Sequence, residues 1–422
     1  MKRFICALLS FVMIILCVSC SEQETDKTHC DSDISLNEQT VAQLGVYEPT
    51  ENIRSDDAVP LNYENQVGMW FTYMDYQNIL KGKSEKEFTK SVSERFKNAK
   101  EMGINTLYVH VRAFNDCYYK SEIFPKGEYY DSDYDPLEIM VREAHELGLS
   151  VHAWINPLRC QTDAQLKALD DSYLIKKWYN DKEKNGTYIV KTGDYWYLNP
   201  AYSDVLNYIS DGIKEIAENY SVDGFHIDDY FYPTTDETFD AAAFSESAGN
   251  DLSSWRIENI SNMVKEIYNT VKIENPDLLF GISPQGNMDS NYTSQYADVK
   301  AWASESGYCD YIVPHIYFGF ENESCPFEKT ADSWKSLNTC EEVKLVIGLC
   351  TYKIGNEDQW AGSGKDEWKN TGGIVSRQAE YCAENGLGIA VYSYASTFSD
   401  TIKEERTKLS ETIKSNYGGE QQ

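Results

Sequence analysis

Several features that mark other protein classes are scarce in this chain. Its 422 residues include only 11 Pro and 25 Gly, with 41% hydrophobic and 25% charged residues. This balance excludes a collagen-like or wholly disordered chain. Basic residues are also few, since 38 Lys and Arg face 68 Asp and Glu and leave a formal net charge of −30. Such an acidic chain would repel nucleic-acid phosphates, so no nucleic-acid partner is expected.

Motifs that bind dinucleotides or metals are missing as well. No Gly-x-Gly-x-x-Gly follows an expected strand, which argues against a dinucleotide-binding open sheet. The eight Cys residues beyond Cys20 form no Cys-x-x-Cys pair, so a zinc ribbon or thioredoxin-like site is unsupported. No His-x-x-x-His spacing occurs, and a carbohydrate deacetylase usually needs a His/Asp metal site. We therefore expect no cofactor and no metal.

The longest apolar run lies at the N-terminus. Residues 4–18 are apolar and follow Lys2 and Arg3, which is the pattern of a signal peptide. The run is too short, and too close to the start of the chain, to favour a permanent membrane-spanning helix. We expect residues 1–19 to form a signal peptide of the lipoprotein type.

The end of this run resembles a bacterial lipoprotein box. Val18-Ser19-Cys20 makes Cys20 the expected lipidated residue, although Cys17 stands where Leu is usual. An ordinary signal peptide cut nearby is the alternative. The polar, acidic residues 20–62 then predict an unpacked tether. We expect a membrane-anchored lipoprotein of the cell envelope, on the outer side of the cytoplasmic membrane or on a Gram-negative outer membrane, with no protein partner implied.

Eight short apolar segments alternate with amphipathic ones through the rest of the chain. The expected strands are residues 67–73, 104–111, 149–155, 223–229, 279–284, 310–318, 344–350 and 388–394. Expected helices include residues 84–103, 135–148, 203–220, 253–271 and 375–386. Eight alternations predict a parallel α/β fold, a (β/α)8 TIM barrel in one domain over residues 63–415, with a tail at 416–422. A doubly wound sheet with a small second domain is the alternative, and the long segment 158–199 is a candidate lid or subsite wall.

Polar residues gather where the expected strands end, which is where TIM barrels carry their active sites. Four of the six His residues lie there. A single such His is more simply a hydrogen-bonded core residue, but four together indicate a site. The candidate substrate-binding residues are His110, Arg112, Asp116, His152, Trp154, Asn156, His226, Tyr232, His315, Tyr317 and Tyr392.

The strongest local signal is the pair Asp228-Asp229 at the end of the fourth expected strand. Adjacent carboxylates repel each other, which costs stability unless they are solvated or useful. The simpler interpretation has one capping a turn and the other facing solvent. However, aromatic neighbours such as Phe225, Tyr230 and Phe231 would raise a carboxyl pKa. One raised and one ordinary carboxylate side by side suit acid/base work on a glycosidic bond, so both are catalytic candidates.

These stretches together resemble the glycosyl-hydrolase-like family ten, bacterial secreted or lipid-anchored TIM-barrel proteins. The matching segments include INTLYVHVR, LGLSVHAWINPLR, VDGFHIDDYFYP and DYIVPHIYF, in family order between Val67 and Tyr394. His315 and Phe318 depart from the family, which has Gln and Trp there. The resemblance implies glycoside hydrolysis of a polysaccharide, and some relatives act on peptidoglycan strands stripped of stem peptides.

Two mechanisms and one non-catalytic alternative follow from this interpretation. A carboxylate could attack the anomeric carbon while an acid from another loop protonates the leaving oxygen, with Asp75, Asp116 or Glu321 as partner. Alternatively, the 2-acetamido group of an N-acetylhexosamine attacks, as in hexosaminidase and O-GlcNAcase families, where adjacent acids end the fourth strand. Asp228 would then orient the acetamido nitrogen and Asp229 would be the general acid/base, which is the mechanism we prefer. A glycan-binding lipoprotein without turnover is the functional alternative.

Overall fold

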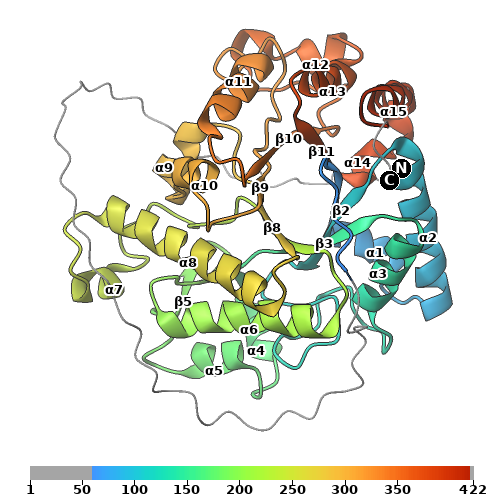
Figure 1. The fold of residues 1–422 in the computed structure, drawn as a ribbon. Helices are drawn as coiled ribbons and strands as arrows, with labels where there is room; N and C mark the ends of the chain where they lie inside the picture. Colours follow the sequence, from blue (N-terminus) through green and yellow to red (C-terminus); the bar gives the residue numbers. More distant parts are fainter. Residues whose placement is uncertain (1–58, 419–422) are drawn as a thin grey trace, which may run out of the picture. The chain divides into compact units, whose positions relative to one another are not determined.

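The computed structural model describes residues 59–418. Eight parallel strands form a closed barrel with helices around it (Figure 1). In pairing order around the barrel they are β1 (Val67–Phe71), β11 (Gly388–Tyr392), β10 (Lys344–Cys350), β9 (Tyr311–Ile312), β8 (Leu279–Ile282), β7 (Gly224–Ile227), β3 (Ser150–Ile155) and β2 (Thr106–Arg112). β1 closes the ring by pairing with both β11 and β2. The predicted TIM barrel is confirmed, and the doubly wound open sheet is excluded.

Helices follow the barrel strands and cover the outside of the barrel. The longer ones are α2 (Glu85–Met102), α3 (Pro136–Glu146), α6 (Ser203–Asn219), α8 (Leu252–Glu274), α11 (Phe327–Leu337), α13 (Ile374–Glu384) and α15 (Lys403–Tyr417). Shorter ones are α1 (Tyr76–Ile79), α7 (Ala241–Glu246), α9 (Met288–Gln295), α10 (Val299–Ser304), α12 (Glu367–Asn370) and α14 (Tyr394–Thr397). The ends of α2 agree with the sequence signals: Ser84 and Glu87 form a capping box, and Gly103 ends the helix with φ +104°. No helix between residues 59 and 418 is long and apolar enough to cross a membrane.

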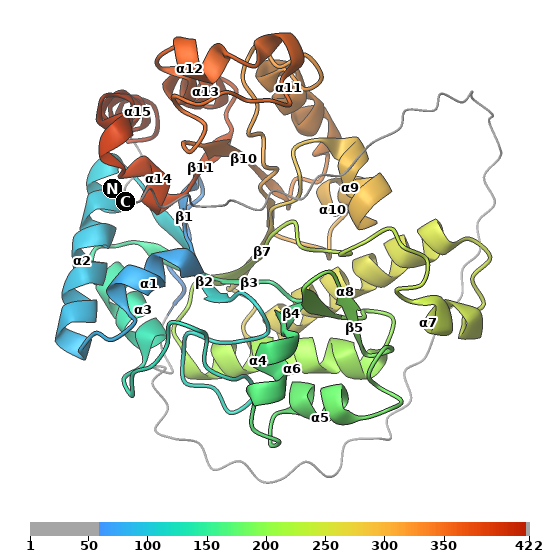
Figure 2. The same cartoon turned by 180° about the vertical axis from the view of Figure 1, so that it is seen from behind.

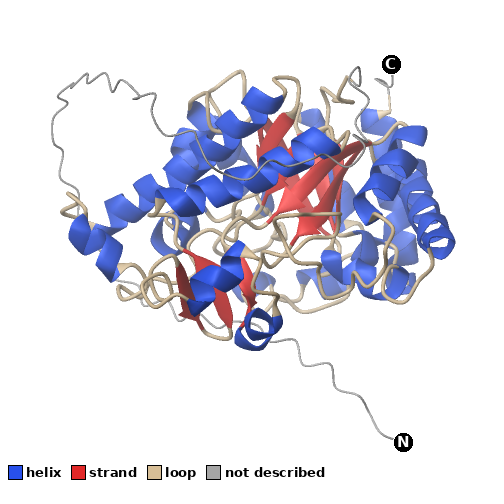
Figure 3. Ribbon diagram, turned by 90° about the horizontal axis from the view of Figure 1, so that it is seen from below, coloured by secondary structure: helices blue, strands red, loops and turns tan. Residues whose placement is uncertain are grey.

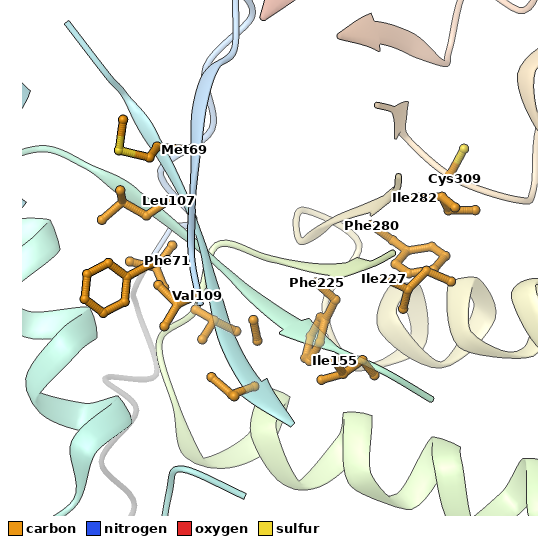
Figure 4. Close-up of a cluster of buried hydrophobic side chains, with 14 of the residues drawn as sticks. Met69, Phe71, Leu107, Val109, Ile155, Phe225, Ile227, Phe280, Ile282 and Cys309 are labelled. Carbon is orange, nitrogen blue, oxygen red and sulfur yellow. The ribbon is translucent and has the colours of Figure 1, made fainter. Parts of the chain in front are cut away.

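Side chains of the barrel strands alternate between the helices and the barrel interior. The outward set packs under the helices, and Figure 4 labels nine of its side chains together with Cys309, which precedes β9: Met69, Phe71, Leu107, Val109, Ile155, Phe225, Ile227, Phe280 and Ile282. The inward set forms a second cluster of Trp70, Tyr108, Trp154, Tyr311, Val313, Val346 and Ala390. Because Phe225 and Ile227 face outward, Asp228 comes at an inward position directly after β7.

The segment 158–199 carries secondary structure of its own. It contains β4 (Arg159–Thr162), α4 (Asp163–Ala168), α5 (Leu174–Asn180), β5 (Ile189–Thr192) and β6 (Tyr195–Leu198). The three strands form an antiparallel sheet in the order β4-β6-β5, seen as a separate group of strands in Figure 3. In this register Arg159 lies opposite Tyr197. Arg159 therefore lies on a strand of this sheet, at the first residue of β4.

Three details of the expected organisation differ from the structure. β9 pairs regularly only over Tyr311–Ile312, because Pro314 has no N–H to donate to the ladder. Residues 59–62 of the expected unpacked tether contact the barrel, where the Leu61 N–H donates to Asp223 Oδ1 at 2.6 Å. α15 continues to Tyr417, two residues past the expected domain end. The expected signal peptide, Cys20 and the tether up to residue 58 lie outside the described residues.

Candidate active site

Polar and aromatic side chains meet where the carboxyl ends of the barrel strands lead into their loops. In Figure 2, α1 and α14, which follow β1 and β11, lie on one side of the barrel, and β4 and β5 lie on the other. We call the side chains at this end the mouth cluster: His110, Trp154, Asn156, Arg159, Asp228, Asp229, Tyr230, His315, Tyr317 and Tyr392.

Asp228 and Asp229 have unequal environments within this cluster. Asp228 is 4% exposed, and its Oδ1 has no hydrogen-bond partner among the described residues. Burial raises the pKa of Asp228 well above its usual value, and repulsion by Asp229 adds to the shift, while Arg159 opposes it. The side chain of Asp229 is 27% exposed. The pair thus combines a buried carboxyl group that favours its protonated form with a second one that is accessible.

Gln295 and His315 are the neighbours of Asp229 in this cluster. The Gln295 side-chain amide donates to the Asp229 backbone carbonyl, and His315 Nδ1 lies 3.9 Å from Asp229 Oδ2. Burial lowers the pKa of His315, and the neighbouring Asp229 opposes that shift. His315 therefore faces Asp229 as a group that favours the neutral state.

Aromatic rings continue from His315 across the mouth. The His315 imidazole stacks on Tyr317 with ring centroids 4.8 Å apart, and Tyr392 lies 5.8 Å from Tyr317. The Tyr317 hydroxyl is buried without a partner in the part of the chain that the structure describes. These rings provide flat apolar surfaces and an unused hydroxyl beside the acid pair, which suits a sugar ring.

His110, Trp154 and Asn156 form another group of the mouth cluster. The His110 ring stacks on Trp154 with centroids 3.6 Å apart. Burial lowers the pKa of His110 well below its usual value, and the positive charge of Arg159 lowers it further. Both polar atoms of the Asn156 side chain, and the Trp154 indole N–H, have no partner within residues 59–418. The structure brings these three residues together, and their role in substrate binding stays a prediction.

Comparison with known proteins identifies the family. Residues 66–362 match the model of the family Glycosyl hydrolase-like 10. The chain belongs to this family. It is 31% identical over 304 residues to the glycosyl hydrolase YngK of Bacillus subtilis (strain 168), across 65% of this chain and 58% of that protein. It is 27% identical over 312 residues to the glycosyl hydrolase DigH of Escherichia coli (strain K12), across 67% of this chain and 69% of that protein. The match to YngK thus spans less than two thirds of that relative's length.

Solved structures agree with the fold. The glycoside hydrolase domain of PgaB (BpsB) from Bordetella bronchiseptica aligns with a TM-score of 0.53 at 12% identity, covering 83% of this chain and 99% of that one. An α-L-fucosidase from Paenibacillus thiaminolyticus aligns with a TM-score of 0.51 at 13% identity, covering 84% of this chain and 50% of that one. At these identities the likeness shows the barrel fold alone.

Two histidines expected to bind substrate lie deeper, inside the barrel. His226 and His152 are fully buried, and their Nδ1 atoms lie 3.0 Å and 2.6 Å from the Tyr311 hydroxyl. On its other side, His226 Nε2 lies 2.9 Å from the Ser283 hydroxyl and 3.3 Å from the Trp70 indole nitrogen. The expected role of both histidines in substrate binding is therefore corrected to an internal hydrogen-bond chain.

Three more expected substrate-binding residues lie elsewhere. A register shift between His110 and Arg112 interrupts the ladder, and the Arg112 guanidinium packs on Phe124, 3.6 Å from the ring centroid. Asp116 accepts hydrogen bonds from two backbone N–H groups of its own loop. The Tyr232 hydroxyl donates to Asp240, at 2.5 Å. Each of the three residues thus has a structural role apart from the acid pair.

Sequence reasoning missed Arg159 as a member of the site. Its guanidinium carbon lies 4.5 Å from the ring centroid of Tyr230, which is itself 42% exposed. The signal was present, since Arg159 ends the segment LGLSVHAWINPLR that carries the family resemblance. Within residues 59–418 no group of three or more His, Cys, Asp or Glu side chains is arranged to hold a metal ion.

Proposed function

We propose that this protein is a glycoside hydrolase that cleaves an N-acetylhexosamine-containing glycan such as peptidoglycan strands, with Asp228 and Asp229 as its catalytic pair. The observation that carries the proposal is the unequal burial of two adjacent carboxyl groups at the mouth of a TIM barrel. Most glycosidases work with one protonated and one ionised carboxyl group. Membership of the Glycosyl hydrolase-like 10 family supports the same class of activity.

The mechanism that fits the acid pair best uses the acetamido group of the substrate. The unpartnered Oδ1 of Asp228 would accept a hydrogen bond from the acetamido N–H. This bond favours the ionised form of Asp228 while the acetamido oxygen attacks the anomeric carbon. The proton that Asp228 releases passes to the more exposed Asp229, which donates it to the leaving oxygen as the glycosidic bond breaks. Asp229 then takes a proton from the water that opens the cyclic intermediate.

The competing mechanism needs an acid from another loop, and two of the three candidates already accept hydrogen bonds from nearby groups. Asp75 accepts from the backbone and hydroxyl of Thr72, both at about 3 Å. Asp116 is bound by its own loop. Glu321 is exposed, and its backbone N–H donates to Glu367. These positions favour the acetamido-assisted mechanism.

The test is incubation of the purified protein with wall glycan strands, with and without stem peptides, followed by product mass analysis. We expect shortened products from stripped strands, and at least ~100-fold less product from Asp228→Asn and Asp229→Asn. Asp133→Asn, at an exposed loop position, serves as the matched control and should retain wild-type activity. Strands that bind but are never shortened would instead support the non-catalytic glycan-binding alternative.

We also propose that a lipid on Cys20 holds the enzyme at the outer side of a bacterial membrane, near the wall glycan. The motif Val18-Ser19-Cys20 supports this location. Replacing Cys20 by Ser should move the protein from the membrane fraction to the soluble fraction. Unchanged membrane fractionation of the variant would contradict a lipid anchor at this residue.

A further inference from the structure

Arg159 lies at the mouth between three aromatic rings. Its guanidinium carbon is 4.2 Å from the ring centroid of Phe114, 4.5 Å from that of Tyr230 and 5.1 Å from that of Tyr195. Phe114 and Tyr195 themselves stack, with centroids 5.3 Å apart. Stacked rings hold a planar guanidinium in a fixed plane and leave its N–H groups to bond at the edge. Arg159 is therefore preorganised as a donor.

This donor has no acidic partner in the protein. The buried Arg256 pairs with Asp240 at 2.6 Å, whereas Arg159 has no carboxylate within 4.0 Å in residues 59–418. Its Nε is buried and makes no hydrogen bond there. A guanidinium without an acceptor is costly. Arg112 also lacks hydrogen-bond partners within residues 59–418 but is fully buried, whereas Arg159 is only partly buried, so an acceptor carried by the substrate can reach it.

The groups near Arg159 do not neutralise its positive charge. Asp228 interacts electrostatically with Arg159, but its buried carboxyl group favours the protonated, neutral form. Lys353, another cation near the mouth, is already bound, since its ammonium donates to Asp358 at 2.7 Å and to the Tyr317 carbonyl at 2.7 Å. In the protein without substrate, Arg159 thus presents positive charge at the mouth with no carboxylate of residues 59–418 within 4.0 Å.

We propose that Arg159 binds a carboxylate carried by the glycan itself, which makes the enzyme selective for acidic sugars. The inference rests on the proposed function in that the mouth cluster binds a glycan. A carboxylate on a short side arm of the sugar matches the planar donor fork of arginine, and muramic acid carries such a group once its stem peptide is removed. With a net charge of −30, the chain as a whole would repel an acidic polymer, so a local cation is needed for such a substrate.

The test measures binding rather than turnover. In an Asp229→Asn background, calorimetry would compare three ligands: a disaccharide containing N-acetylmuramic acid, its methyl ester, and chitobiose. The methyl ester keeps the shape and removes the charge. We expect the free acid to bind at least ~10-fold more tightly than the ester, as charge-assisted hydrogen bonds of arginine to a carboxylate allow.

Substitutions of Arg159 decide whether this residue is responsible. Arg159→Gln should bring acid and ester to within about twofold of each other, while Arg159→Lys should keep part of the preference, since it retains the charge but not the fork. Arg377→Gln is the matched control, because Arg377 also lies 4.2 Å from a ring centroid, that of Phe320, but on the exposed side of α13. Its preference should equal that of the parent protein.

The outcomes separate this inference from the proposed function. Equal affinity of the parent protein for acid and ester would overturn the role of Arg159, even if the wild type hydrolyses glycans. A preference that survives Arg159→Gln would also overturn it. Selective binding without any hydrolysis by the wild type would leave Arg159 as the carboxylate receptor and would remove the hydrolase proposal instead.

Discussion

The imidazole Nδ1 of His315 lies 3.9 Å from the Asp229 carboxylate. Burial lowers the pKa of His315, so the ring is neutral at neutral pH. Below that pKa a cation forms beside Asp229 and favours its ionised form, which cannot donate a proton. We therefore expect activity to fall on the acid side as His315 takes up a proton.

Replacement of His315 by Gln should keep most of the activity at neutral pH and weaken the loss on the acid side. The reason is that Gln fills the position without acquiring charge. The pH dependence of kcat/KM of both proteins on stripped wall glycan measures this. His145→Gln is the control, because His145 binds Asp223 at the opposite end of the barrel, at 2.8 Å. An acid limb that is the same in both proteins would exclude His315 as its origin.

Asp228→Asn should stabilise the protein and abolish activity at the same time. The folded state holds the proton of Asp228 above the pH at which the unfolded chain releases it. Stability from this group is therefore full below the unfolded pKa and is lost as pH rises through the folded pKa. The variant should gain on the order of 2–4 °C in Tm at pH 8 and much less at pH 4. A lower Tm at pH 8 would contradict the burial account.

Tyr311→Phe should cost stability without changing substrate preference. The hydroxyl joins His226 to His152 inside the barrel, and its removal leaves buried ring nitrogens unpaired. Such a loss costs about 1–3 kcal/mol. Urea unfolding measures the cost, and the ratio of kcat/KM values on two glycans tests the preference. A changed ratio with unchanged stability would place Tyr311 in contact with substrate.

The sequence was sufficient to predict the barrel because each strand is a short apolar run bounded by turn signals. The helix ends followed from local chemistry, as with Ser84 and Gly103 of α2. The acid pair was also predictable, since Asp228 and Asp229 follow a strand that is hydrophobic on its outward side. The strands, the helix ends and the acid pair all depend on residue types at neighbouring positions and on the spacing of apolar residues.

How deep a side chain lies in the barrel, and where the pairing of two strands shifts register, could not be predicted in the same way. His152 and Trp154 share an inward face, but only the closed barrel determines that His152 lies in the interior while Trp154 stacks on His110 near the mouth. A register shift at the end of β2 turned Arg112 toward Phe124. These outcomes depend on contacts between segments far apart in sequence.

The most direct measurement of the central claim compares two substrates in the Asp229→Asn variant. An aryl N-acetylhexosaminide has a good leaving group that needs no protonation, whereas an unactivated disaccharide needs a general acid. We predict that Asp229→Asn loses ~100-fold or more in kcat/KM on the disaccharide and far less on the aryl glycoside. Asp228→Asn should be impaired on both, because the acetamido group is unsupported in each. Near-wild-type hydrolysis of the disaccharide by both variants would contradict the assignment of Asp228 and Asp229 as the catalytic pair.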